Sequence, residues 1–215
     1  MHSQKENKVS VLFSGGKDSS LTAFILAKIF EVELITATFG LLSNWKQAEK
    51  VAELLNFPFK LLKMDEKILE ETVQTIIKDG RPANGIKYIH KKVLEEIAKN
   101  SRLVADGVRR NDRVPVLSIS EIMSFEEKFK VHYIQPLMGF SRKTLDLLTE
   151  KYFLFNEYKG ESFPGAEYEF EIREMIKRKY GSSEIEEIFP KDHTHSIVIK
   201  MKSLEHEKEK TNMPL

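Results

Sequence analysis

Five apolar runs, separated by amphipathic stretches, occupy the first 152 residues of the chain. The run at residues 9–13 is of the kind that a buried parallel strand shows, because both faces of such a strand are covered. The runs predict strands at residues 9–13, 32–40, 57–65, 102–110 and 132–140. Apolar residues at helical spacing predict helices at residues 21–29, 44–56, 66–78, 85–99 and 141–152. This alternation predicts an α/β domain with a mainly parallel sheet and right-handed crossovers.

The pattern changes after residue 152. Residues 156–170 are typical of a loop, residues 169–181 have helical spacing, and residues 193–201 indicate a short strand. We therefore predict a sheet domain over residues 1–152 and a small α/β appendage over residues 153–205. The polar tail at residues 206–215 is expected to be disordered.

The composition narrows the chemistry. A formal net charge of +1 gives no global electrostatic case for a nucleic-acid-binding protein, although it is compatible with a local basic patch. The chain has no cysteine, which excludes disulfides, zinc–thiolate sites, iron–sulfur clusters and a cysteine nucleophile. The N-terminus lacks a signal region, and no apolar run approaches the roughly 20 residues of a membrane span. A cytoplasmic protein without a membrane partner is therefore expected.

The turn after the first predicted strand has the residue types of an anion site. The glycines Gly15 and Gly16 let backbone amides approach an anion, and the N-terminus of the following helix favours negative charge. Lys17 adds a point charge, and the flanking Ser14 and Ser19 add hydroxyl donors. The carboxylate of Asp18 is suited either to cap the helix or to hold a Mg²⁺ that bridges phosphates. A purely structural glycine connection is the alternative.

Two common nucleotide loops do not fit this spacing. A Walker A loop needs a glycine five residues before its Gly-Lys-Ser/Thr element, but the matching position here is Val11 and the residue after Lys17 is Asp18. A dinucleotide fingerprint needs glycines at its first, third and sixth positions, whereas this turn has only Gly15 and Gly16.

The sequence SGGKDS at positions 14–19 resembles the PP-loop of the ATP pyrophosphatase superfamily, also called adenine nucleotide alpha hydrolases. The resemblance covers about residues 8–152 and implies a five-stranded parallel sheet sandwiched by helices, a HUP or Rossmann-like fold. It implies ATP and Mg²⁺ as cofactors, and cleavage of ATP between the α- and β-phosphates. The adenine would lie at the end of the second strand, beside Thr38 and Phe39. The leaving pyrophosphate would be held by Ser14, Gly15, Gly16, Lys17, Asp18 and Ser19.

The loop at residues 105–115 is the second candidate, because it follows the fourth predicted strand and is rich in charged residues. Superfamily members place a polar stretch with an acid here, near the α-phosphate and the metal, and this loop is similar in position and polarity. The resemblance implies that Gly107 lies against the nucleotide and that Asp112 joins Asp18 on Mg²⁺. Arg109 would neutralise the α-phosphate or bind an acidic substrate. A solvated loop with self-paired charges is the alternative. The candidate catalytic residues are thus Lys17, Asp18, Arg109 and Asp112.

Two weaker candidates lie elsewhere. Lys87 and Lys91 are one turn apart on a predicted helix, so a phosphate-bearing substrate such as tRNA could lie there. A solvated helix face is the preferred interpretation. His193 and His195 could share a metal with Asp192, although two histidines without a firm third ligand are more often surface or hydrogen-bonding residues.

The motif and the resemblance together predict an enzyme that forms AMP and pyrophosphate from ATP while it adenylates an acceptor. The acceptor is expected to be a tRNA or a small carboxylate, so the enzyme would be a ligase or a nucleotide-modifying transferase. Because the chain has no cysteine, free ammonia, an amino acid or an external sulfur donor remain as nucleophiles. The expected partners are ATP, the acceptor and a second copy of the chain. A non-catalytic ATP- or AMP-binding regulator is the alternative.

Overall fold

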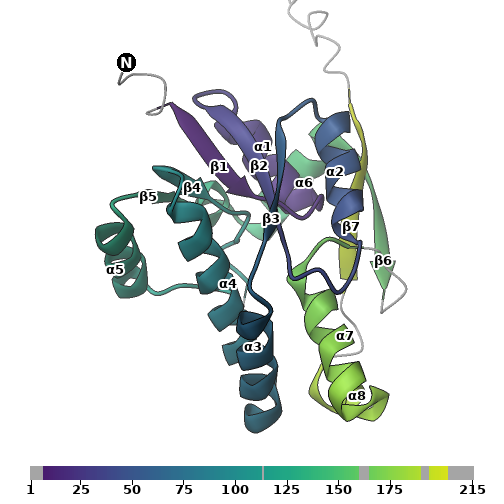
Figure 1. Ribbon diagram of the computed structural model, residues 1–215. Coiled ribbons are helices and arrows are strands. Elements are labelled where there is room, and N and C mark those ends of the chain that lie inside the picture. Colours follow the sequence, from purple (N-terminus) through teal and green to yellow (C-terminus); the bar gives the residue numbers. More distant parts are fainter. Residues whose placement is uncertain (1–6, 113, 160–164, 190–193, 203–215) are drawn as a thin grey trace, which may run out of the picture.

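A central five-stranded sheet organises the molecule (Figure 1). The computed structural model describes residues 7–112, 114–159, 165–189 and 194–202. The strands of the sheet are β1 (Lys8–Leu12), β2 (Glu31–Thr38), β3 (Phe59–Lys63), β4 (Leu103–Ala105) and β5 (His132–Ile134). They run parallel, in the order β3-β2-β1-β4-β5. The predicted fold class, a parallel sheet sandwiched by helices, is confirmed.

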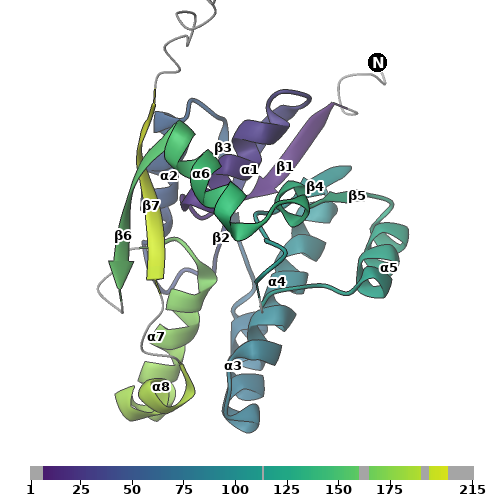
Figure 2. The same cartoon turned by 180° about the vertical axis from the view of Figure 1, so that it is seen from behind.

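Helices cover both faces of this sheet (Figures 1 and 2). One face is packed by α1 (Lys17–Leu26), α2 (Trp45–Leu54) and α6 (Arg142–Tyr152). The other face is packed by α3 (Glu66–Asp79), α4 (Ala83–Ala98), α5 (Ile119–Phe129) and α7 (Tyr168–Tyr180). Successive side chains of a strand point to opposite faces, so Leu34 of β2 lies in the first core and Ile35 lies in the second.

β4 and β5 are shorter than predicted. Each has three residues, whereas the patterns at residues 102–110 and 132–140 predicted longer strands. β4 ends at Ala105, because the next hydrogen bond to β5, from the Asp106 N–H to the carbonyl of Ile134, is stretched to 3.4 Å. β5 ends because Gln135 leads into the 3₁₀ helix η1 (Pro136–Gly139), and proline cannot donate a ladder hydrogen bond.

Besides η1, three elements were not predicted from the sequence: α5, α8 (Ser182–Ile188) and β6 (Phe153–Lys159). β6 continues directly from α6 and pairs antiparallel with β7 (Thr194–Met201), which was predicted as a strand. The prediction of a loop from residue 156 is therefore wrong over residues 156–159, which belong to β6. α5 begins with a capping box between Ser118 and Glu121, a signal that can be read in the sequence.

Residues beyond 152 pack into the same two cores as the sheet domain. Ile172 and Ile176 of α7 lie in the core beside α3 and α4, and Phe153 and Val198 of the β6–β7 hairpin lie in the core beside α1 and α2. The predicted tail at residues 206–215 lies outside the described residues. Among the helices that the structure describes, none is long and apolar enough to cross a membrane.

Candidate functional site

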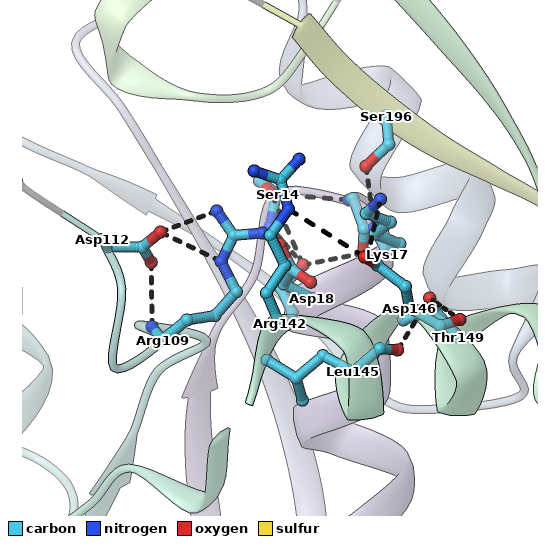
Figure 3. Close-up of polar contacts among 12 residues, drawn as sticks. Ser14, Lys17, Asp18, Arg109, Asp112, Arg142, Leu145, Asp146, Thr149 and Ser196 are labelled. Carbon is cyan, nitrogen blue, oxygen red and sulfur yellow. Dashed lines mark hydrogen bonds and ion pairs between the residues drawn. The ribbon is translucent and has the colours of Figure 1, made fainter. Parts of the chain in front are cut away.

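The candidate site lies where the strand order reverses. β1 has β2 on one side and β4 on the other, and ligands of open parallel sheets bind beyond the carboxyl ends of strands at such a switch point. The turn at residues 14–19 follows β1, and the loop at residues 106–112 follows β4. Arg109 Nη1 lies 3.2 Å from Asp18 Oδ2, so the two predicted loops meet in one site (Figure 3).

Gly15 holds the first turn against α2. Its φ of +79° lies in the left-handed region, which glycine adopts without strain. A Cβ on Gly15 would lie 3.2 Å from the Cα of Ala48, so a side chain has no room there. The hydroxyl of Ser14 accepts the N–H of Gly16 at 3.4 Å and lies 3.4 Å from Ser19 Oγ. Backbone amides and two serine hydroxyls therefore gather in one turn.

Arg109 has a carboxylate on each side. α1 begins at Lys17 with Gly16 as its N-cap and no capping side chain, so Asp18 does not cap the helix and pairs with Arg109 instead. Asp112 Oδ1 accepts from Arg109 Nη2 at 2.6 Å and from Nε at 2.9 Å, and Oδ2 accepts the Arg109 N–H at 2.8 Å. Two opposite charges of the β4 loop, those of Arg109 and Asp112, thus pair with each other. This pairing orients the guanidinium of Arg109 toward Asp18.

The carboxyl group of Asp18 binds its proton more tightly than an exposed aspartate does. Burial raises its pKa above the ordinary value of 3.8, and the positive charges of Arg109 and Lys17 offset only part of this effect. A carboxylate whose ionised form is disfavoured by the fold binds a cation readily, because the cation compensates for the lost hydration. Asp18 therefore has the properties of a ligand for a divalent cation.

Asp18→Asn is expected to raise the melting temperature at pH 7, because burial disfavours the ionised carboxylate and the amide carries no charge. Below pH 3.8 the carboxyl is protonated in both the folded and the unfolded chain, so the two proteins should differ little. Between 3.8 and the raised pKa, the folded chain holds a proton that the unfolded chain has lost, so wild-type stability falls as the pH rises. In melting curves from pH 4 to pH 8, the difference in melting temperature between Asp18→Asn and wild type should widen as the pH rises and become constant above the raised pKa of Asp18. A variant that melts lower than wild type at pH 7 would contradict this account.

Gly107 sets the distance between the two loops. A Cβ built on Gly107 would lie 3.0 Å from the backbone N of Ser19 and 3.2 Å from the carbonyl carbon of Asp18. Because both neighbours are backbone atoms, they cannot rotate away as a side chain would. The β4 loop can therefore approach the start of α1 this closely only with glycine at this position.

Gly107→Ala is expected to lower the free energy of unfolding by about 1–3 kcal/mol, because the new methyl group overpacks against the α1 backbone. Gly139→Ala is the matched control, since a Cβ at Gly139 would meet nothing within 4 Å. Urea unfolding of both variants measures the difference. Equal midpoints for the two would show that the contact with α1 has no energetic importance.

The Lys17 ammonium faces the C-terminal hairpin. Nζ lies 3.1 Å from Glu157 Oε1 on β6, 3.7 Å from Asp146 Oδ1 on α6 and 5.0 Å from the centre of the Phe155 ring. Glu157 lies opposite Ser196 in the β6–β7 ladder, and Ser196 Oγ accepts the backbone N–H of Lys17 at 3.2 Å (Figure 3). The sequence did not predict that Asp146, Glu157 and Ser196 belong to this site, because no local motif marks them.

A buried polar network lies behind the β4 loop. Asp106 Oδ2 is hydrogen-bonded to His90 Nε2 at 2.9 Å and to the Tyr133 hydroxyl, and Oδ1 accepts the N–H of Val108 at 3.1 Å. His90 Nδ1 lies 2.8 Å from the hydroxyl of Tyr168. Burial and the charge of Asp106 raise the pKa of Tyr133, so its hydroxyl remains a donor. Asp106 therefore anchors the loop from inside.

The end of β2 is occupied by a carboxylate of the protein. Glu171 of α7 is buried and accepts the N–H of Phe39 and the N–H of Leu41, each at 2.9 Å. It also accepts from the hydroxyl of Thr38 at 3.2 Å. The polar groups of Thr38 and Phe39, expected beside the adenine, thus hold α7 against the sheet. The Phe39 side chain lies in the hydrophobic core.

Two lysines of the basic stretch on α4 pair with acidic side chains that lie outside the two loops. Lys87 pairs with Glu121 at 2.8 Å, and Lys92 Nζ lies 3.6 Å from Glu95 Oε2. His90, on the same helix, is buried in the network with Asp106. These pairings are those of a solvated helix face with one buried side, which was the preferred interpretation.

The C-terminal histidines are only partly described. His195 is buried, and its Nδ1 lies 3.3 Å from Glu167 Oε2. The other two residues of the candidate metal site, Asp192 and His193, lie outside the described residues. Within the described part of the chain, no three metal-ligating side chains come together.

The chain is similar to known proteins over nearly its whole length. A family model described as a family of unknown function (DUF7411) matches residues 7–200. The uncharacterized protein MJ0690 of Methanocaldococcus jannaschii is 44% identical over 195 residues, which cover 90% of this chain and 96% of that protein. A crystal structure from Methanocaldococcus jannaschii, described as a predicted subunit of tRNA methyltransferase, has a TM-score of 0.83 at 44% identity. The similarity covers 91% of this chain and 97% of that one.

Proposed function

The chain belongs to DUF7411, a family of unknown function, and we propose that it binds ATP at the turn after β1 and cleaves it to AMP and pyrophosphate. The observation that carries the proposal is the meeting of this turn with the β4 loop at the switch point of the sheet. The turn has the residues SGGKDS, and the opposite loop presents Arg109 3.2 Å from Asp18. One loop would hold the leaving pyrophosphate, and the other would contact the α-phosphate.

The phosphate contacts would come from three kinds of group. The amides at the start of α1 and the hydroxyl of Ser14 are donors suited to phosphate oxygens. The Ser19 hydroxyl donates to the carbonyl of Gly16 at 3.2 Å and would have to turn away from it to contact a phosphate. The Lys17 ammonium is a compact point charge, and the Arg109 guanidinium is a planar fork that Asp112 orients. These groups would stabilise the charge that develops on the pyrophosphate as its bond to the α-phosphorus breaks and an acceptor oxygen takes its place.

Mg²⁺ fits Asp18 better than Asp112. Both oxygens of Asp112 accept hydrogen bonds from Arg109, whereas Asp18 pairs with that guanidinium through Oδ2 at 3.2 Å. The ion pairs that the structure describes at the site join four carboxylates to three cations: Asp18, Asp112, Asp146 and Glu157, with Lys17, Arg109 and Arg142. A polyphosphate would therefore need to enter with a divalent cation, which would supply charge neutralisation. Asp18 would hold it, and Asp112 would serve to orient Arg109.

We favour a tRNA over a small carboxylate as the acceptor. The similar structure from Methanocaldococcus jannaschii is described as a predicted subunit of tRNA methyltransferase. Arg110 in the β4 loop is exposed, and the Arg142 side chain at the start of α6 is 74% exposed, so both cations are available to nucleic-acid phosphates.

The proposal is tested by measuring AMP formation from ATP and Mg²⁺, with total tRNA or with a panel of small carboxylates. We expect tRNA to stimulate AMP formation. If a small carboxylate stimulates AMP formation and tRNA does not, the carboxylate is the acceptor and the preference for tRNA is wrong. ATP binding without AMP formation under all conditions would favour the regulatory alternative instead, and absence of both would contradict the proposed site.

A further inference from the structure

The β6–β7 hairpin is hydrogen-bonded to the turn that follows β1. The N–H of Val198 donates to the carbonyl of Gly15 at 3.1 Å, and Ser196 Oγ accepts the N–H of Lys17 at 3.2 Å. The carbonyl of Ser196 would lie 3.3 Å from a Cβ on Gly16, so β7 lies directly on the glycine turn. The backbone contact of Val198 fixes where the hydroxyl of Ser196 is placed.

Ser196 contacts the backbone of Lys17, and Glu157 contacts its side chain. They are partners across the β6–β7 ladder, so their side chains start from the same rung of the hairpin. Ser196 contacts the backbone N–H of Lys17, while Glu157 contacts its ammonium at 3.1 Å. The hairpin therefore approaches the residue of the turn that carries both an amide donor and a cation.

The hydroxyl of Ser196 can accept the N–H of Lys17 and donate to a ligand at the same time. A hydroxyl has two acceptor lone pairs and one donor hydrogen. Oγ of Ser196 accepts the N–H of Lys17 with one lone pair, which leaves its own hydrogen as a donor. Accepting from an amide polarises the O–H and makes it a better donor. Within the part of the chain that the structure describes, this O–H donates to no protein acceptor. Ser196 is half-buried, at the same turn as the hydroxyls of Ser14 and Ser19.

We propose that Ser196 is a phosphate-binding residue, whose hydroxyl donates to an oxygen of the pyrophosphate portion of ATP. The inference rests on the proposed function, because it assumes that the turn at residues 14–19 holds this group. It extends the site to the C-terminal part of the chain: the phosphate site would be completed by Ser196 of β7, which lies 177 residues beyond Ser19, the last residue of the turn.

Calorimetric titration of the full chain with Mg-ATP, Mg-pyrophosphate and AMP tests the inference. Ser196→Ala is expected to weaken the binding of ATP and of pyrophosphate by about tenfold to a hundredfold, the usual effect of losing a hydrogen bond to a charged group. AMP binding should not change, and the melting temperature should fall by no more than about 4 °C, because only the Lys17 N–H loses its acceptor. Ser196→Thr should restore binding, because it retains the hydroxyl and β-branched residues suit strands. Thr194→Ala is the control, since Thr194 is exposed on the same strand.

The outcomes separate the inference from the proposed function. If wild type binds neither ATP nor pyrophosphate, the proposed function is wrong and the role of Ser196 is wrong with it. If wild type binds both and Ser196→Ala binds them equally well, only the role of Ser196 is overturned. Equal weakening of AMP and pyrophosphate binding, together with a larger fall in the melting temperature, would assign Ser196 a structural role and would also overturn the inference.

Discussion

Lys17→Ala is expected to lower the rate of AMP formation by about a hundredfold to a thousandfold, the usual effect of removing one group that stabilises developing charge. In the proposed reaction, the lysine is the cation that the turn itself would supply to the leaving pyrophosphate. The free energy of unfolding should change by less than about 1 kcal/mol, because its partners Asp146 and Glu157 are 41% and 52% exposed and such pairs contribute little. Steady-state rates and urea unfolding, measured on the same preparation, check both parts.

Lys28→Ala is the matched control for this prediction. Lys28 follows the last turn of α1, and its ammonium lies over the ring of Phe24, 4.7 Å from the ring centre. The control removes one positive charge near the same helix but leaves the turn intact, so its AMP formation should equal that of wild type. If both variants lose activity equally, general electrostatics rather than the turn would explain the effect.

Asp106→Ala is expected to lower the free energy of unfolding by about 3–5 kcal/mol, because it leaves buried polar groups without their charged acceptor. The carboxylate accepts from Tyr133 and from the N–H of Val108 and is hydrogen-bonded to His90 Nε2. The Asp106 side chain is only 3% exposed, so water cannot replace it without entering the core. Equilibrium urea unfolding measures the loss.

Asp65→Ala provides the comparison for this large effect. Asp65 also accepts a backbone N–H, that of Lys67 at the start of α3, but it does so in an exposed position. Its loss should cost about 1 kcal/mol, the usual effect of removing an N-cap. A cost for Asp106→Ala no larger than that of Asp65→Ala would show that the network does not support the β4 loop.

The parts of the site that the sequence predicted are those set by local pattern. The turn at residues 14–19 follows an apolar run and precedes a helical one, so its place at the end of β1 could be inferred. The β4 loop could be placed opposite it, because parallel strands present their carboxyl ends at one edge of a sheet. The contact of Arg109 with Asp18 is the result of that topology.

The remaining parts depend on pairings between distant segments. Glu157 and Ser196 reach Lys17 only because β6 and β7 form an antiparallel hairpin, and neither residue lies in a recognisable motif. Glu171 reaches the N–H of Phe39 across 132 residues of sequence. Such contacts are fixed by tertiary packing and not by local propensity, so a single sequence does not predict them.

The bond that is cleaved in ATP tests the central claim most directly. Wild-type protein is incubated with Mg²⁺ and tRNA, free of added pyrophosphatase, and with ATP labelled either in the α- or in the γ-phosphate. A site that holds pyrophosphate in the turn and places Arg109 on the α-phosphate predicts that the α label appears in AMP and the γ label in pyrophosphate. Recovery of the α label in ADP and of the γ label in inorganic phosphate would contradict it.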